Sequence, residues 1–299
     1  MAGHDGADTE GGPTRVWTRD RLAEGLAGLR LMPGQDVLVH CSLRNVGWLE
    51  HGPQTLLEAL VDVLGPGSTV VVPAQTTYNS WSSPTHRRST VGMSSRQLSE
   101  YLAAAPGFDP ATTPSQGMGI FAEHVRTRPG AYRSAHPQTS FAALGPAAAE
   151  ISRPHPLASH LGEDSPLGRL HARGARTLLL GVGFDRATVF HLAEYWPSRP
   201  RRPYHAKICG PRGNEASWVR FEGVELNDSD FPALGEQMLK ETWVSTGPVG
   251  SASCYSFPMR PAVKFARRWL AEHRLGFRRR FPWDDERAAT RPSRPRTDA

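Results

Sequence analysis

The segment 37–74 constrains the fold more than any other part of the chain. Val37–His40 is a short apolar run containing β-branched residues, which predicts a buried strand. Between Pro53 and Gly65 the apolar residues recur at helical spacing, and this stretch predicts an amphipathic helix. Ser68–Ala74 predicts a second buried strand. A strand, a helix and a strand in this order form a crossover between parallel strands, so the segment predicts an α/β fold.

The rest of the chain extends this unit. Arg176–Val182 is the clearest further central strand, and Ser140–Leu144 predicts another. Residues 204–226 predict antiparallel strands around a turn at Gly210–Asn214, whereas 75–95 predicts a loop over a site. Further helices are expected over 19–31, 167–173, 231–240 and 261–273. We therefore expect a mixed, mostly parallel central sheet covered by helices, with a smaller antiparallel β portion.

The length of 299 residues fits one large domain or two small ones. We expect a single domain over residues 15–281. Residues 1–14 are polar and rich in glycine, so they predict a disordered leader. Residues 282–299 contain Pro, Arg and Asp but little that could pack, so they predict a disordered tail.

The basic excess of the chain is confined to one end. The formal net charge is +6, yet Arg260–Ala299 contains twelve of the 35 basic residues and only five of the 29 acidic ones. This segment therefore has a charge of +7, and residues 1–259 together have −1. A near-neutral body gives no reason to expect a nucleic-acid partner.

Composition also limits the compartment and the cofactors. Cys41, Cys209 and Cys254 are widely spaced and include no C-x-x-C pair, which argues against a disulfide framework and a cysteine zinc site. No window approaches 18 uninterrupted apolar residues, so no membrane span is expected. The chain has no Walker A, G-x-G-x-x-G, G-x-S-x-G or H-E-x-x-H motif. We expect a cytoplasmic protein without a metal cofactor.

Candidate chemistry lies on the exit loops of the predicted strands, where open α/β sheets bind their ligands. After the strand 176–182, His191 and Glu194 are three residues apart and share one face of a helix. A carboxylate so placed can orient an imidazole as a general base. The alternative is a buried core histidine beside a solvent-facing glutamate.

Two other polar clusters allow both a functional and a structural interpretation. His155–Pro166 is dense in histidines and carboxylates, but it could equally be a turn in which Asp164 or Ser165 caps the next helix. Arg133-Ser134-Ala135-His136 could bind an anionic group or form a surface ion pair.

Together these stretches resemble the aminoglycoside 3-N-acetyltransferase family. The matching blocks are VLVHCSLRNVGWLEHG and the residues that follow it (37–73), SQGMGIFAEHVRTRPGAYRSAHPQTSFAALG (115–145), HLGEDSPLGRL (160–170), TLLLGVGFDRATVFHLAE (177–194) and GPVGSA (247–252). They cover most of residues 20–255 in the family's order. The resemblance implies an α/β/α sandwich, acetyl-CoA as donor and direct transfer to an amine.

The resemblance also implies roles for individual residues. His160 becomes the expected general base, with His191 and Glu194 completing the catalytic group and orienting it. The residues expected to contact coenzyme A are Ser42, Leu43, Arg44, Val46, Gly47, Met118, Gly119, Arg133, Ser134 and His136. Cys41 lies beside this group and suggests an acetyl-cysteine route, but the family pattern does not require a thiol there, so we expect a small packing residue.

The charge of the segment 76–89 bears on the identity of the acceptor. Aminoglycosides carry several ammonium groups, yet the segment 76–89 has no acid and includes His86, Arg87 and Arg88. An acidic cleft would have to be supplied by other residues, such as the acidic stretch Glu222–Asp230. The residues expected to contact the acceptor are Tyr78, Trp81, Glu163, Asp164 and Asp185.

Three hypotheses follow for the function. The first is acetylation of an aminoglycoside, the second is the same chemistry on a less cationic amine, and the third is a protein that sequesters a ligand without catalysis. We expect a small-molecule amine as the partner, no nucleic acid or membrane, and a monomer or homodimer.

Overall fold

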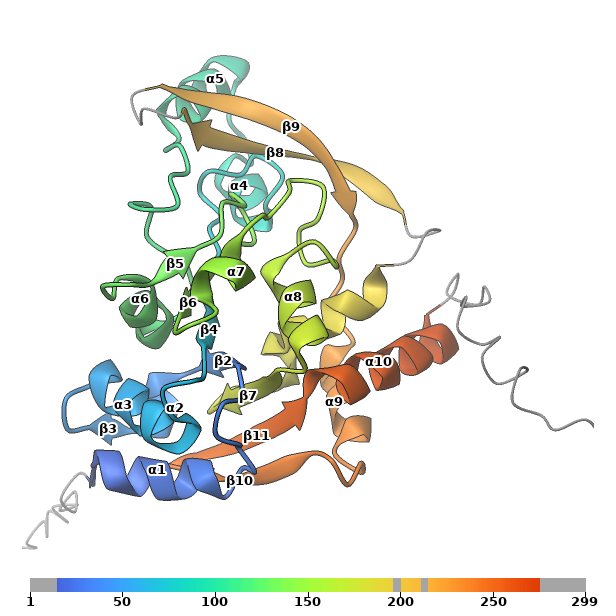
Figure 1. Cartoon of the computed structure of the whole chain (residues 1–299). Coiled ribbons are helices and arrows are strands. Elements are labelled where there is room, and N and C mark those ends of the chain that lie inside the picture. Colours follow the sequence, from blue (N-terminus) through green and yellow to red (C-terminus); the bar gives the residue numbers. More distant parts are fainter. Residues whose placement is uncertain (1–14, 196–199, 211–214, 275–299) are drawn as a thin grey trace, which may run out of the picture.

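The centre of the fold is a seven-stranded sheet. The computed structural model describes residues 15–195, 200–210 and 215–274, so the predicted leader 1–14, the tail 282–299 and part of the predicted turn at 210–214 lie outside the described residues. The order of the strands across the sheet, drawn in Figure 1, is β10 (Ser245–Val249), β11 (Ala252–Pro258), β7 (Arg176–Leu180), β2 (Val37–Cys41), β4 (Val70–Pro73), β6 (Phe141–Leu144) and β5 (Tyr132–Arg133).

The mixed sheet is as predicted, but the expectation that it is mostly parallel is wrong. Strand β2 pairs in parallel with β4 and β7, whereas the pairings β10–β11, β11–β7, β4–β6 and β5–β6 are antiparallel. Only two residues separate β10 from β11 and seven separate β5 from β6, and such short connections return the chain in the opposite direction. No strand was predicted over β10, β11 or β5, and β5 has only two residues, so their antiparallel pairings were not expected.

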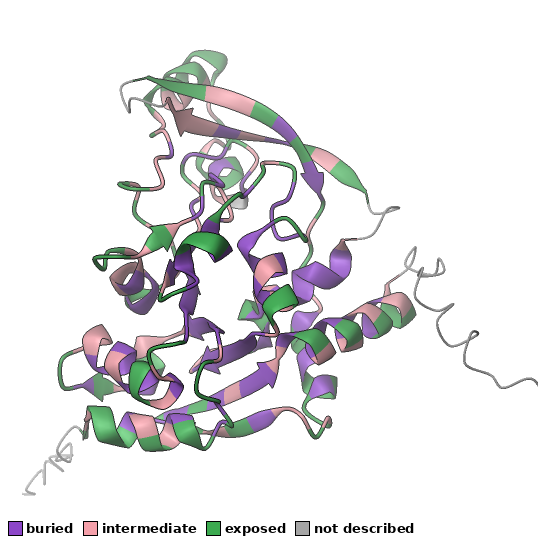
Figure 2. Ribbon diagram, viewed as in Figure 1, coloured by how far each residue is buried: buried purple, intermediate pink, exposed green. Residues whose placement is uncertain are grey.

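Alternate residues of the central strands pack into two hydrophobic clusters on opposite faces. Val37 and Val39 of β2 contribute to one cluster and Leu38 to the other, as the period of two in a strand requires. The first cluster includes α1 (Arg19–Ala27), α3 (Pro53–Leu64) and α6 (Ile120–Arg126). The second includes α7 (Ala148–Ser152), α8 (Pro166–Arg173), α9 (Phe231–Met238) and α10 (Met259–His273). Figure 2 shows the buried central strands between these helices, and the predicted α/β fold is confirmed.

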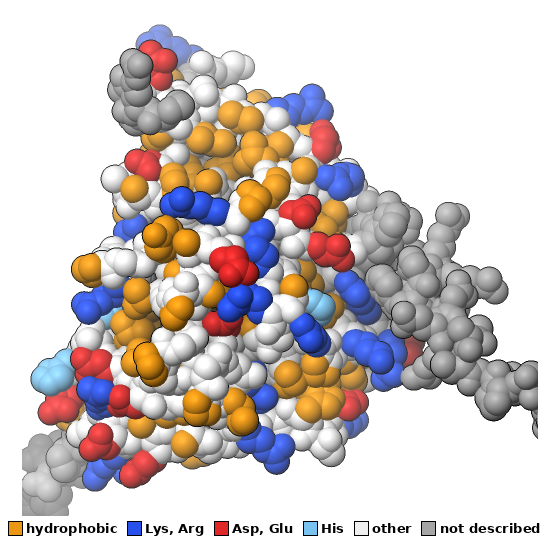
Figure 3. Space-filling view, viewed as in Figure 1, with side chains coloured by type: hydrophobic (Ala, Val, Ile, Leu, Met, Phe, Trp, Pro, Cys, Tyr) orange, Lys and Arg blue, Asp and Glu red, His pale blue; other side chains and the backbone are white. Residues whose placement is uncertain are grey.

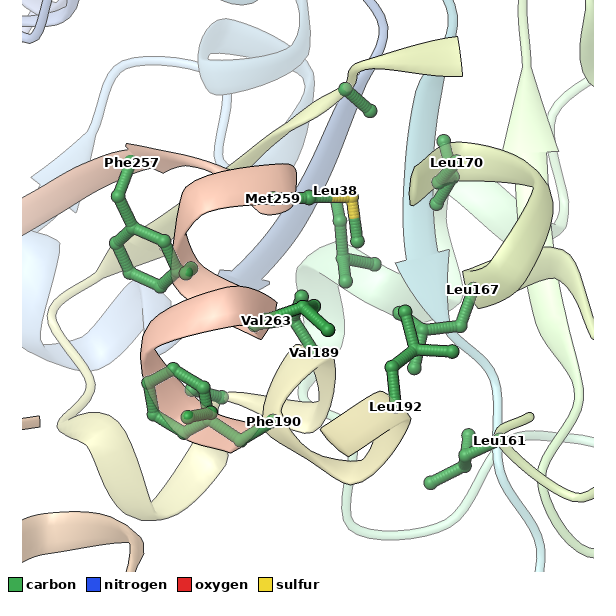
Figure 4. Packing of buried hydrophobic residues seen from close by; sticks show 14 of the residues in the cluster. Leu38, Leu161, Leu167, Leu170, Val189, Phe190, Leu192, Phe257, Met259 and Val263 are labelled. Atoms are coloured by element: carbon green, nitrogen blue, oxygen red, sulfur yellow. The ribbon is translucent and has the colours of Figure 1, made fainter. Parts of the chain in front are cut away.

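The second cluster places the segment that follows β7. This segment contains two 3-10 helices, η1 (Phe184–Arg186) and η2 (Thr188–Glu194). In Figure 4, Phe190 of η2 lies beside α10 and Leu192 lies near Leu167 of α8. Each fully buried side chain of this size contributes about 1.5–3 kcal/mol of hydrophobic free energy. The packing therefore holds η2 firmly against two helices.

A separate antiparallel hairpin covers one end of the sheet, as predicted. It consists of β8 (Arg201–Cys209) and β9 (Ala216–Val224), and it contacts the body through bridges from Ser80 to Ala206 and from Phe108 to Ile208. Figure 1 shows it above α4 (Pro84–Ser89) and beside α5 (Ser95–Ala104).

The predicted loop 75–95 is in part helical, because Ser83 caps α4. The next helix, α5, begins with a capping box of Ser94 and Gln97.

Three small elements complete the described chain: α2 (Leu43–Val46) and the paired strands β1 (Val16–Trp17) and β3 (Trp48–Leu49). Among the described residues, no helix is long and apolar enough to cross a membrane. On the face shown in Figure 3, acidic and basic side chains are interspersed over the described body.

Candidate active site

A pocket of about 770 Å³ opens at the carboxyl ends of the parallel strands β2, β4 and β7. This is where an open α/β sheet is expected to bind its ligands. The pocket residues from the strand ends and their loops include His40, Cys41, Ser42, Asn45, Gln75, Gly181 and Gly183. Those from later segments include Met118, Gly119, Thr139, Leu161, Asp185, Arg186, Thr188, His191, Leu226, Asp228 and Phe231.

A glycine allows the chain to turn from β7 into this pocket. Gly181 has φ +65°, and a Cβ atom there would lie 2.8 Å from the Cβ of Asn45 and 3.2 Å from that of Ala252. The side-chain amide of Asn45 donates to the carbonyl oxygen of Gly181 at 2.7 Å. This contact ties the loop after β2 to the loop after β7, so the two walls of the pocket are held together.

His191 and Glu194 form a directly bonded pair at the pocket. The imidazole Nδ1 lies 2.6 Å from a carboxylate oxygen of Glu194, and His191 is among the pocket residues. Residues three apart are eclipsed in a 3-10 helix, which explains why the two side chains meet. The alternative interpretation of a solvent-facing glutamate is wrong, because Glu194 is 0% exposed.

Glu194 has further partners that keep it ionised. Its oxygens accept hydrogen bonds from the backbone amide of Asn227, at 3.1 and 3.3 Å, and from the guanidinium of Arg274. Burial alone would raise the pKa of Glu194, but the hydrogen bonds and charges of His191 and Arg274 outweigh it, and the pKa is lowered. A buried carboxylate therefore faces the imidazole and can fix its tautomer.

Two carboxylates and one guanidinium contribute charge to the pocket. Asp185 and Asp228 are both exposed pocket residues, and Arg186 forms an ion pair with Asp185 at 3.0 Å. The predicted acidic stretch Glu222–Asp230 thus supplies one acidic pocket residue, Asp228. The formal sum of these three groups is one negative charge, which favours a cationic ligand.

His160 lies outside the pocket, in a buried cluster of histidines. It is 2% exposed, and its ring centroid is 4.5 Å from that of His136 and 4.3 Å from that of Tyr204 on β8. Burial, followed by nearby cationic groups, lowers the pKa of His160 to about 3. Its Nε2 is buried beneath the hairpin, and a Cβ added to Gly223 of β9 would lie 2.7 Å from it. Its neighbours Thr139 and Leu161 are pocket residues, but His160 itself is not.

Comparison with known proteins decides the family. The sequence model of the family described as aminoglycoside 3-N-acetyltransferase matches residues 38–271. YokD of Bacillus subtilis, an aminoglycoside N(3')-acetyltransferase-like protein, is 35% identical over 85% of this chain and 92% of its own. The chain belongs to the aminoglycoside 3-N-acetyltransferase family. It is an N-acetyltransferase, as its sequence predicted.

Solved structures agree with this assignment. The crystal structure of YokD superimposes with a TM-score of 0.79 and covers 87% of this chain and 95% of its own. A binary complex of AAC-IIIb with CoASH has a TM-score of 0.75 at 29% identity and covers 86% and 97% of the two chains. AAC-VIa bound to sisomicin has a TM-score of 0.74 at 30% identity and covers 87% and 100%.

Of the residues that the family resemblance implied for coenzyme contact, Ser42, Met118 and Gly119 are pocket residues. Gly119 has φ +85°, and a Cβ atom there would lie 3.3 Å from the carbonyl oxygen of Cys41. Val46 is buried in the core instead, and its amide and that of Gly47 donate within α2, to Ser42 and Leu43 at 3.1 Å. Leu43 is half-buried and Arg44 is exposed, both outside the pocket residues.

Arg133, Ser134 and His136 have structural partners in place of the expected ligand. Arg133 donates to the backbone carbonyls of Thr113 and Ala74 and, at 3.1 Å, to Ser140. The Ser134 hydroxyl accepts from the Phe141 amide at 2.9 Å. His136 is 0% exposed and accepts backbone amides through Nδ1. Among the described residues, Arg133 has no ion pair, so the surface ion pair is not observed, and the coenzyme contact of these three residues stays a prediction.

The residues implied for the acceptor divide in the same way. Asp185 is a pocket residue, whereas Glu163 and Asp164 are exposed beside α8, which Ser165 caps as one alternative predicted. Tyr78 and Trp81 are exposed outside the pocket residues, and Trp81 packs on His205 of the hairpin at 4.9 Å. The basic cluster of His86, Arg87 and Arg88 lies on α4, also outside the pocket residues.

His40 and Thr188 are further polar pocket residues, and both lie where a predicted strand ends, which is where candidate chemistry was expected. His40, at the end of β2, is buried with its Nε2 at 3.2 Å from the Thr188 hydroxyl, and burial, followed by the charge of Arg186, lowers its pKa to about 3. No site role was predicted for either residue.

Cys41 also borders the pocket, but burial raises the pKa of its thiol. A thiolate nucleophile is therefore disfavoured. Among the described residues, no group of three or more His, Cys, Asp and Glu side chains could hold a metal ion.

Proposed function

We propose that the chain transfers the acetyl group of acetyl-CoA to an amine of an aminoglycoside, with His191 as the general base. The observation that carries this proposal is the His191–Glu194 pair at the edge of the pocket, bonded at 2.6 Å. The imidazole is assigned to donate from Nδ1 to Glu194, which leaves Nε2 as the acceptor. The role of base thus moves from His160, which is buried away from the pocket, to His191.

The chemistry follows from the state of the acceptor. An amine that enters as an ammonium ion has no lone pair, so it must lose a proton to attack the thioester carbonyl. Nε2 of His191 takes this proton, and Glu194 stabilises the imidazolium that results. The new C–N bond replaces the C–S bond. The attacking nitrogen loses its second proton to the leaving sulfur, so coenzyme A leaves as the thiol, and His191 releases the first proton to solvent. The raised pKa of Cys41 supports direct transfer over an acetyl-cysteine intermediate.

The coenzyme has a suitable place beside this pair. Gly119 lacks a side chain where a Cβ atom would crowd the Cys41 carbonyl, so the backbone between Met118 and Gly119 stays accessible from the pocket. Ser42 offers a hydroxyl on the same wall. AAC-IIIb, which shares this fold, binds CoASH, and this supports coenzyme A as the co-substrate here.

The charged residues of the pocket favour a cationic acceptor. Asp185 and Asp228 place two carboxylates in the pocket against the single guanidinium of Arg186, and the basic cluster on α4 lies outside it. AAC-VIa binds sisomicin, an observation that favours an aminoglycoside over a less cationic amine. Asp185 and Asp228 are therefore the residues that we assign to the ammonium groups of the acceptor.

A thiol-release assay with acetyl-CoA and a panel of amines tests the proposal. Aminoglycosides should be acetylated faster than amines with one charge, and Asp228→Asn should raise the KM of an aminoglycoside about fivefold, as expected for one partly exposed ion pair. Asp164→Asn is the matched control, since Asp164 is exposed outside the pocket residues. If no aminoglycoside releases thiol at saturating donor, the acceptor assignment fails. Tight aminoglycoside binding without thiol release would instead indicate sequestration.

A further inference from the structure

We propose that Arg274 is a positioning residue for the acetyl transfer, because it fixes Glu194 and balances the charge of the His191–Glu194 pair. This inference rests on the proposed function. Arg274 follows α10 and is 80 positions from Glu194 in sequence, yet its guanidinium donates directly to the Glu194 oxygen Oε1. The other oxygen, Oε2, faces His191.

The two oxygens of Glu194 face different side chains. Oε2 is 2.6 Å from Nδ1 of His191, while Oε1 accepts from Arg274. The amide of Asn227 lies between the two oxygens, at 3.1 Å from Oε1 and 3.3 Å from Oε2. A carboxylate held at both oxygens cannot rotate about its terminal bond without losing a charge-assisted hydrogen bond. Arg274 therefore directs Oε2 at the imidazole.

Arg274 is itself held in a fixed orientation. Its Nε donates to Asp230 Oδ2 at 2.6 Å, its Nη2 donates to the other oxygen of Asp230, and Nη2 also donates to the carbonyl of Asn227 at 2.6 Å. This is the two-pronged geometry that a guanidinium makes with a carboxylate. The guanidinium carbon lies 6.0 Å from the ring centroid of Phe231, and that ring is 4.8 Å from the ring of His191. The side chain of Arg274 is only 10% exposed.

The charges explain why an arginine is useful here. Glu194 and Asp230 are two carboxylates that both contact one guanidinium, so their charges are partly neutralised. Without Arg274, both carboxylates would stabilise the protonated imidazole, and less of His191 would be available as a base at neutral pH. Other charged or titratable groups that line the pocket with His191 include Asp185, Arg186, Asp228, His40 and Cys41, and His160 lies close enough to interact with its charge.

The arginine therefore has a predicted signature in the pH profile. Arg274→Ala should move the acidic limb of the kcat/KM profile to higher pH by about one unit. Asp230→Asn removes a negative charge and should move the same limb to lower pH. A residue that merely tethered the end of α10 would produce no such opposite shifts.

The experiment compares acetyl transfer by the full chain and by single variants. Arg274→Ala should lower kcat about 10- to 100-fold, the usual range for a residue that orients a catalytic ligand, and should leave the KM of acetyl-CoA within twofold. Millimolar guanidinium, but not sodium at equal ionic strength, should restore part of kcat. Arg274→Lys keeps the positive charge but cannot form the two parallel hydrogen bonds of a guanidinium. This variant should therefore keep the acidic limb of the pH profile at its wild-type position and have an intermediate kcat.

Arg260→Ala is the matched control. Arg260 lies on α10, which Arg274 follows, and donates to the carbonyls of His171 and Ala172, far in the chain from Glu194. It should lower the melting temperature while leaving kcat unchanged. The inference is overturned if Arg274→Ala keeps a wild-type kcat and pH limb, or if it loses kcat with no guanidinium rescue. If His191→Ala itself retains wild-type kcat, the proposed function fails instead.

Discussion

Lowering the pH from 7.5 to 5.5 should destabilise the folded state, because four buried histidines must remain neutral in it. Burial lowers the pKa to about 3 for His40 and His160 and to about 4 for His155, and it also lowers the pKa of His136 well below its ordinary value. In the unfolded chain each imidazole has its ordinary pKa of about 6.5. The unfolded state therefore binds more protons below pH 6.5, and stability is lost as the pH falls through this value.

The size of the effect follows from these values. At pH 5.5, one unit below the unfolded pKa, His40, His155 and His160 each cost about 1.4 kcal/mol, so together they cost about 4 kcal/mol. His136 adds to this loss in the same direction. This is a large part of the roughly 5–15 kcal/mol by which a domain is stable. Unfolded carboxyl groups titrate near pH 4, so they contribute little in this window.

Urea denaturation followed by tryptophan fluorescence at pH 7.5, 6.5 and 5.5 measures this loss. In His160→Gln the difference in unfolding free energy between pH 7.5 and 5.5 should shrink by about 1.4 kcal/mol. His51→Gln, at an exposed position, is the matched control and should keep the full difference. A wild-type difference below about 1 kcal/mol, or an NMR titration of His160 near pH 6.5, would refute the reasoning.

Three further predictions concern the pocket residues Gly119 and Cys41 and the packing of the hairpin β8–β9 on His160. Gly119→Ala should raise the KM of acetyl-CoA, because Gly119 is a pocket residue with φ +85° and its Cβ would lie 3.3 Å from the Cys41 carbonyl. Gly92→Ala, with φ +80° and nothing within 4 Å, should cost about 1 kcal/mol of stability and leave that KM unchanged; equal KM values in the two variants would contradict the assignment. Cys41→Ala should keep at least half of the wild-type kcat, and an acetylated Cys41 peptide in quenched wild-type enzyme would count against direct transfer. Gly223→Ala should destabilise the protein by about 1–3 kcal/mol, since its Cβ would lie 2.6 Å from His160; a chemical denaturation midpoint equal to that of Gly67→Ala, where the Cβ meets only Gly34 at 3.8 Å, would show that the hairpin is not packed tightly on His160.

Local patterns were sufficient for the central unit of the fold. Segment 37–74 contains its own strand, helix and strand, and the structure has β2, α3 and β4 there. The contact between His191 and Glu194 was predictable for the same reason, because a spacing of three fixes which side chains share a face. The pocket lies at the ends of the parallel strands, as the fold class requires.

Contacts between distant segments were beyond local patterns. His160 has many polar neighbours in sequence, and they suggested a functional site. In the structure the hairpin β8–β9 packs over His160 through Tyr204 and Gly223. Arg133 beside a serine suggested an anion site, yet its donors reach the carbonyls of Ala74 and Thr113. Hydrogen bonds of this kind satisfy buried backbone groups, and they are determined by the folded arrangement rather than by neighbours in sequence.

The same reasoning explains why Arg274 and Asp228 were not singled out. Arg274 stands among many basic residues near the C-terminus, and only the packing of α10 on η2 brings it to Glu194. Asp228 is one of several acids in 222–230, and the turn before α9 determines which of them faces the pocket.

The turnover numbers of His191→Gln and His160→Gln, measured side by side at saturating acetyl-CoA and aminoglycoside, test the central claim most directly. Loss of the general base should lower kcat about 10²–10⁴-fold in His191→Gln, with coenzyme affinity retained. Folded His160→Gln should keep a kcat within a fewfold of wild type, because His160 is buried outside the pocket residues. A near-wild-type kcat in His191→Gln, together with a collapse in His160→Gln, would contradict the assignment of His191 as the base.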